Sequence, residues 1–151
     1  MMTRVSNDTE FRKALESLDS TRQRLVAARF VENVLALCSD QRVAHIIQIA
    51  GNSEASEAEL ADALKNARAT TFDCHTRCGS EGDWSEQAGY FVARAATAAL
   101  TPVGQMPSGP AWQAALSCRM AQTSMSIVTG DDTAAEESNQ QYRILSGYLD
   151  S

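Results

Sequence analysis

The fold of this chain is decided by residues 20–50, which read STRQRLVAARFVENVLALCSDQRVAHIIQIA. In the first half of this stretch, apolar residues recur every three or four positions, at Ala27, Phe30, Val31, Val34, Leu35 and Cys38. Residues with this spacing share one side of an α-helix, where they can pack against a core. The pattern therefore predicts an amphipathic helix over residues 20–38.

The second half of the stretch predicts another helix. Asp40 fits its N-cap, because an aspartate side chain accepts hydrogen bonds from the free amides of a first helical turn. The expected buried residues are again three or four positions apart, at Val43, Ile46, Ile47 and Ala50. Gly51 and Asn52 tolerate the left-handed conformation that ends many helices, so we expect this helix to stop there.

The helical period extends over the rest of the chain, where no segment shows the alternation typical of strands. Further helices are predicted over residues 7–18, 56–78, 83–100, 110–129 and 134–149. Ser56 and Glu59 have the form of a capping box, and Asp83 with Glu86 repeats it. Residues 101–110 hold all three prolines, and we expect them to form the one real loop and the most mobile segment.

The same periodicity predicts which side of each later helix is buried. On residues 56–78 the stripe is Leu60, Leu64, Ala67, Thr71, His75 and Cys78. On residues 83–100 it is Trp84, Ala88, Phe91, Val92, Ala95 and Ala99. On residues 110–129 it is Trp112, Leu116, Met120, Thr123 and Ile127, and on the last helix Ala134, Ser138, Tyr142, Leu145 and Leu149. Alanine-rich stretches allow helices to approach closely.

These elements predict an all-α fold with six or seven helices in bundle-like or orthogonal packing. The length of 151 residues suits a single domain spanning the chain, with residues 1–19 as an N-terminal helix or arm. A hydrophobic content of 44% with 21% charged residues excludes a disordered chain. Residues 1–10 are polar and no apolar run could cross a bilayer, so we expect a cytoplasmic protein with no membrane partner.

The charge of the chain favours some partners over others. The net charge is −6, and residues 43–151 carry thirteen acidic against six basic side chains. An acidic domain repels phosphate backbones and attracts basic proteins, which disfavours nucleic acid as a partner. The one candidate basic patch is Arg22, Arg24 and Arg29, although acidic neighbours make a solvated helix face the simpler interpretation.

The cysteines offer a weak metal candidate. Cys74, His75 and Cys78 lie close together on a predicted helix and present the sulfur and nitrogen ligands that zinc prefers. A fourth ligand is missing nearby, and His45 or Cys118 would have to arrive through the fold. Free cysteines more often pack as small hydrophobic residues. We therefore expect no metal and no cofactor.

Sequence motifs of catalysis are absent. The chain has no glycine-rich phosphate loop, no G-x-S-x-G elbow and no H-E-x-x-H helix. The acidic pairs Asp131–Asp132 and Glu136–Glu137 stand at a predicted helix start, where capping and the helix dipole explain them. We predict no catalytic residues and no enzymatic activity.

Two segments resemble a known family. RLVAARFVENVLAL, beginning at Arg24, followed by DQRVAHII, beginning at Asp40, is similar to the opening of small all-helical immunity proteins of bacterial polymorphic toxin systems. Asp40 and Arg42 match the family's Asp and Arg, while Val43 stands where the family has Pro. The alanine-rich residues 58–69 and 88–99 and the closing EESNQQYRILSGYL also resemble its later helices, so the similarity spans residues 21–149.

The resemblance implies a non-enzymatic protein that binds and neutralises a cognate bacterial toxin. An acidic surface would speed its encounter with a basic toxin or another basic protein. The candidate contact residues are Glu81, Asp83, Asp131, Asp132 and Glu136.

Two alternatives stay open. The chain could be a helical structural subunit of a larger assembly, such as an RNA-guided defence complex, with Arg22, Arg24, Arg29 and Arg42 on a nucleic-acid backbone. It could instead hold a metal or redox site at Cys74, His75 and Cys78.

Overall fold

Seven α-helices and one 3-10 turn account for most of the residues that the structure describes. This computed structural model describes residues 5–78, 83–131 and 134–150, and of Cys78 and Ala134 it describes the backbone. The elements are α1 (Asp8–Glu16), α2 (Ser20–Val34), η1 (Leu35–Leu37), α3 (Gln41–Ala50), α4 (Glu57–Cys78), α5 (Trp84–Leu100), α6 (Pro110–Thr129) and α7 (Ala134–Leu149). Since no strand occurs within these ranges, the predicted all-α fold is confirmed.

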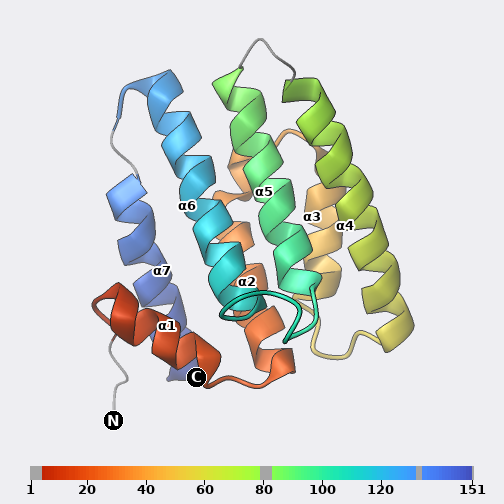
Figure 1. The fold of residues 1–151 in the computed structure, drawn as a ribbon, viewed down its shortest axis with the longest axis vertical. Coiled ribbons are helices and arrows are strands. Elements are labelled where there is room, and N and C mark those ends of the chain that lie inside the picture. Colours follow the sequence, from red (N-terminus) through yellow and green to blue (C-terminus); the bar gives the residue numbers. More distant parts are fainter. Residues whose placement is uncertain (1–4, 79–82, 132–133, 151) are drawn as a thin grey trace.

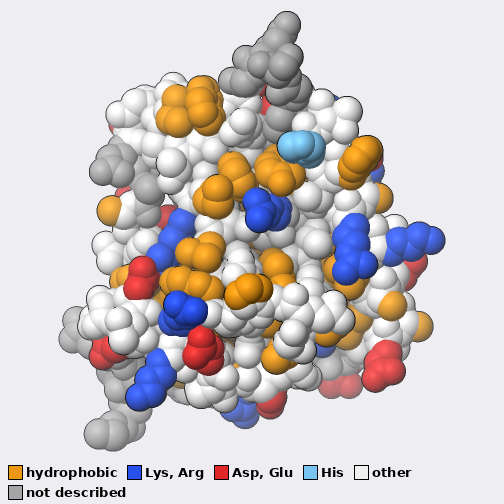
Figure 2. Space-filling model, viewed as in Figure 1, with side chains coloured by type: hydrophobic (Ala, Val, Ile, Leu, Met, Phe, Trp, Pro, Cys, Tyr) orange, Lys and Arg blue, Asp and Glu red, His pale blue; other side chains and the backbone are white. Residues whose placement is uncertain are grey.

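The helices form two packed layers. In Figure 1, α4, α5 and α6 run side by side along the long axis with α5 in the middle, and α2 and α3 lie behind them. The space-filling view from the same side shows hydrophobic side chains at the surface across the middle of this layer, among scattered charged ones (Figure 2). Helix α7 packs against α6, and α1 crosses the same end of the molecule as the start of α2. The core lies between the two layers, where α2 meets both α5 and α6.

The contact between α5 and α6 is built from small side chains. The buried side of α6 consists of Pro110, Ala111, Ala114, Ala115, Ser117, Cys118, Ala121 and Ser124. The predicted stripe on this helix is wrong, because Met120 and Ile127 are 45% and 52% exposed. Alanine and serine let helix backbones approach closely, so in a helix packed between α2, α5 and α7 they take the inner face.

Two further predictions of burial on α4 and α5 are also wrong. His75 is exposed, and Trp84 is 42% exposed at the first residue of α5. Phe91 and Thr71 are half-buried. The remaining stripe residues of α5, such as Ala88, lie in the core as expected.

The chain leaves α2 earlier than the sequence predicts. Val34 has φ −113° and ψ 8°, and Leu35–Leu37 continue as a 3-10 turn instead of the last turn of an α-helix. The backbone is then extended at Cys38, which brings Asp40 to the start of α3. There its carboxylate accepts a hydrogen bond from the Arg42 amide at 3.1 Å, so the predicted N-cap is confirmed.

Helix α1 is held by an aromatic cluster around one arginine. The ring of Phe11 packs 5.6 Å from Phe30, 6.0 Å from Trp112 and 5.4 Å from Tyr142, measured between centroids. The Arg119 guanidinium lies over the Phe11 ring at 5.5 Å and donates two hydrogen bonds to the carboxylate of Asp8. These contacts fasten the start of the chain to α6 and α7.

Glu137 is buried, whereas the sequence analysis explained it by helix capping and the helix dipole. Its carboxylate accepts hydrogen bonds from Asn33, Gln122 and Gln141, at 3.2, 3.3 and 3.1 Å. Gln141 is buried as well and donates a second bond to the Ala115 carbonyl. Burial raises the pKa of Glu137 above its usual range. Glu137 and Gln141 of α7 therefore form a polar network with side chains of α2 and α6.

Candidate functional site

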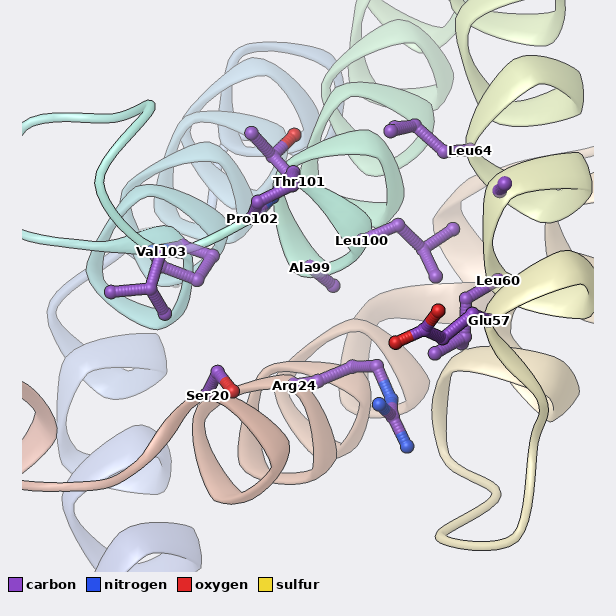
Figure 3. A pocket seen from close by; sticks show the side chains of 12 residues that line it. Ser20, Arg24, Glu57, Leu60, Leu64, Ala99, Leu100, Thr101, Pro102 and Val103 are labelled. Carbon is purple, nitrogen blue, oxygen red and sulfur yellow. The ribbon is translucent and has the colours of Figure 1, made fainter.

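An apolar groove of about 520 Å³ opens at one end of the molecule. It lies where α2 and α4 begin, where α5 ends and where α6 begins, so four separate segments supply its walls (Figure 3). Its lining residues are Ser20, Arg24, Glu57, Leu60, Ala61, Leu64, Ala99, Leu100, Thr101, Pro102, Val103 and Pro110. We call this cavity the groove.

The walls of the groove are mostly hydrocarbon. Figure 3 shows the side chains of Leu60 and Leu64 on α4 facing Leu100 at the end of α5, with Val103 and Pro102 on the opposite side. Val103 is 47% exposed, which leaves an apolar side chain partly in water at the mouth. Such a surface suits an apolar group, because covering it removes hydrocarbon from water.

Arg24 ties the groove to the end of α3. Its Nε donates to the Ala50 carbonyl and its Nη2 to the Asn52 carbonyl, both at 2.9 Å. These carbonyls lie at a helix end, where they lack partners within the helix. Partial burial lowers the pKa of Arg24 from its usual value, and the side chain stays charged at neutral pH.

The segment of residues 101–110 is anchored to its neighbours. The Gln113 side chain donates to the Pro107 carbonyl at 2.8 Å, and Arg12 donates to the Ser108 hydroxyl. Gly109 has φ +89° and lies against the side chain of Gln23. The Oε1 atom of that buried glutamine has no hydrogen-bond donor among the described residues. The segment therefore forms a packed wall of the groove.

Acidic residues are concentrated around the start of α4. Glu54, Glu57, Glu59 and Asp62 are all exposed, and residues 54–62 contain no basic residue. Glu59 is engaged in the predicted capping box, since the Ser56 amide donates to it at 3.0 Å and its own amide donates to the Ser56 hydroxyl at 3.1 Å. Of these four acidic residues, Glu57 lines the groove, and Arg24 adds a positive charge to the lining.

The acidic residues predicted to bind a partner lie elsewhere. Glu81 and Asp132 fall outside the described residues. Asp83 is exposed and caps α5 by accepting from the Ser85 and Glu86 amides, while Asp131 and Glu136 are exposed near the start of α7. The end of α4, the start of α5 and the end of α6 lie at the end of the molecule opposite the groove (Figure 1).

The arginines of the nucleic-acid alternative have mostly structural contacts. Arg24 is bound to backbone carbonyls, and Arg42 is paired with Asp40 at 2.7 Å. Arg29 lies 5.0 Å over the Tyr148 ring. Arg22 and Arg29 are seven positions apart on the exposed side of α2 and so share one face. Arg24 and Arg42 do not lie on that face, so the four arginines form no common surface for a nucleic acid.

The two candidate metal ligands whose side chains are described do not converge. Cys74 is buried, whereas His75 is exposed and packs at a tilt against Tyr90 with 5.2 Å between ring centroids. The Cys78 side chain lies outside the description. Within the described part of the chain, no group of three or more His, Cys, Asp or Glu side chains could hold a metal ion.

Sequence reasoning missed the groove. Its leucines were assigned to a buried stripe, and Glu57 received no role, because a groove shared by four segments has no local signature. Comparison of the chain with protein-family models, with curated proteins and with solved structures gives no match. The immunity-family resemblance therefore stays a prediction. Within the described ranges, no helix is both long enough and apolar enough to cross a bilayer.

Proposed function

We propose that this chain is a non-catalytic binding module that holds a partner polypeptide, and that the groove receives an apolar side chain of that partner. The observation that carries the proposal is the groove itself, whose 520 Å³ lies in the range of ligand-binding cavities. Protein interfaces are anchored by a few large side chains that fill such cavities, and polar groups surround them.

The charge around the groove supports a basic partner. Glu57 lines the groove beside the leucine wall, three further exposed carboxylates occur within residues 54–62, and the whole chain carries a net charge of −6. A lysine or arginine next to an apolar anchor would meet Glu57 as the anchor enters. In keeping with the family resemblance, the partner we propose is a bacterial toxin that the chain neutralises. Asp83, Asp131 and Glu136 would then aid long-range attraction.

A pair of matched variants tests the groove. Ala61→Arg places a long charged side chain at the groove, whereas Ala69→Arg makes the same change at an exposed position of α4 outside it. Short random peptides displayed on phage and selected on the wild-type chain should carry an aromatic or leucine residue beside lysine or arginine. We expect Ala61→Arg to weaken their binding about tenfold or more, with Ala69→Arg close to wild type.

The toxin assignment has its own test. The product of the neighbouring gene is expressed alone and together with this chain, and growth and co-elution are measured. We expect arrest by the neighbour alone, rescue by the wild type and by Ala69→Arg, and failure of rescue by Ala61→Arg. If the product of the neighbouring gene is harmless and forms no complex, the toxin assignment is wrong. If the two variants behave equally, the groove is not the binding site.

A further inference from the structure

Two thiols border a second cavity, of about 190 Å³, at the opposite end of the molecule from the groove. Cys38 enters it from the turn before α3, and Cys74 lies on its α4 wall. Gly89 on α5 lies next to Cys38, whose sulfur would make an ordinary contact of 3.8 Å with a Cβ at that glycine. The exposed side chains of Arg77 and Glu86 also line the cavity, so small solutes can reach it from solvent.

One guanidinium joins Cys74 to the start of α3. Nη2 of Arg77 lies 3.0 Å from the sulfur of Cys74 and 3.0 Å from Oδ2 of Asp40. The Asp40 carboxylate is fixed in turn by Arg42, so the arginine next to Cys74 is held in place. A positive hydrogen-bond donor on sulfur favours the thiolate, which is the form of cysteine that reacts with peroxides.

Cys38 differs from Cys74 in its surroundings. Its sulfur contacts the Asp40 carbonyl at 3.9 Å and receives no bond from an arginine among the described contacts. Burial raises the pKa of the Cys38 thiol, and the neighbouring Cys74 adds to the rise. The cavity therefore pairs a cysteine that accepts a hydrogen bond from an arginine with a cysteine that does not.

We propose that Cys74 is a site of oxidation by hydroperoxides and that Cys38 resolves it as a disulfide. The Cys74 thiolate attacks one peroxide oxygen, so that an S–O bond forms and the O–O bond breaks. The sulfur loses two electrons and keeps the attacked oxygen as a sulfenic acid, while the other oxygen leaves as hydroxide, or as alkoxide from an organic hydroperoxide, and takes up a proton. The Cys38 sulfur then attacks the sulfenic sulfur, and its proton leaves with the departing oxygen as water.

Cys118 serves as an internal reference. It is fully buried on α6, and desolvation raises its pKa well above the usual range. Buried thiols whose pKa is raised stay protonated and are poor nucleophiles. We expect Cys118 to stay reduced while Cys38 and Cys74 react.

The test uses the full chain, freed of reductant and treated with hydrogen peroxide. Of its four cysteines, two should lose their reaction with N-ethylmaleimide, and a digest should contain a peptide that links Cys38 to Cys74. Cys38→Ser should stop the reaction at a Cys74 sulfenic acid, which dimedone labels. Cys78→Ser should give the same link as the wild type, and Cys74→Ser should retain all its remaining thiols.

Arg77 is tested as a positioning residue. Arg77→Gln should slow oxidation of Cys74 about tenfold, whereas Arg68→Gln, at an exposed position of the same helix, should leave the rate unchanged. Circular dichroism confirms that each variant is folded. Four free thiols after peroxide treatment, a link from Cys74 to Cys78, or equal rates in the two arginine variants would overturn the proposal. None of these results depends on the groove.

Discussion

Replacing Gly109 by alanine will destabilise the protein more than the same replacement at Gly104. Gly109 has φ +89° and ψ 165°, a backbone conformation that is almost confined to glycine. A Cβ at this position would also lie 2.6 Å from Oε1 of Gln23, closer than real Cβ atoms come to other atoms. The glutamine is buried, so it has little space into which it can move.

The size of the loss follows from three contributions. The backbone strain costs about 1–3 kcal/mol. Displacing Gln23 breaks the hydrogen bond from its Nε2 to the Leu18 carbonyl at 3.2 Å, and this loss adds about 1 kcal/mol to the destabilisation. Alanine also restricts the unfolded chain, which offsets about 0.4–1 kcal/mol. We therefore expect the free energy of unfolding to fall by about 1–3.5 kcal/mol.

Urea unfolding followed by circular dichroism measures this change against two controls. Gly104 has φ +98° with no atom near its Cβ position, so Gly104→Ala should show only the backbone strain. Gly147 lies in α7 with open space around it, so Gly147→Ala should stabilise the protein by about 0.5–1 kcal/mol. If Gly109→Ala costs no more than Gly104→Ala, the close contact with Gln23 is not the cause of the loss.

Three further changes test other parts of the fold. Arg119→Lys removes the two-bond contact with Asp8 and should cost about 1–2 kcal/mol, with faster amide exchange in α1; unchanged exchange would contradict this anchor. Because the folded-state pKa of Glu137 is raised, its contribution to stability is present below its usual value of 4.5 and lost as pH rises through the folded value. Glu137→Gln should therefore gain stability relative to the wild type as pH increases above about 4.5, and a pH-independent difference in urea midpoints would refute the assignment. Ala95→Leu should overfill the core and cost about 1–3 kcal/mol in thermal or urea unfolding, whereas Ala69→Leu on the exposed side of α4 should be nearly neutral.

Helix ends were the most predictable part of the fold. Asp40, Ser56 and Asp83 make the capping bonds that their positions predict, and Gly130 ends α6 with φ +80°. Capping depends on a few neighbouring residues, so the signal is present in the local sequence. The extent of α2 was overestimated because the 3-10 turn keeps the same apolar residue types.

Burial was harder to predict where small residues surround a helix. On α6, Ala114 and Ser117 face the core while Met120 faces solvent, a choice that depends on the neighbouring helices. The groove was unpredictable for a similar reason, since α2, α4, α5 and α6 meet only in the folded chain. Glu137 shows the same limit, because its partners Asn33 and Gln122 are distant in sequence.

The tight packing of α5 against α6 also determines where the molecule can carry a reporter group. Added atoms on the inner side would force the two backbones apart, since alanine and serine leave no spare volume there. Met120 and Ile127 instead stand at the outer surface, and a dye or crosslinker attached at either position would extend into water. Helix α6 can thus be labelled along its outer edge without loosening the core.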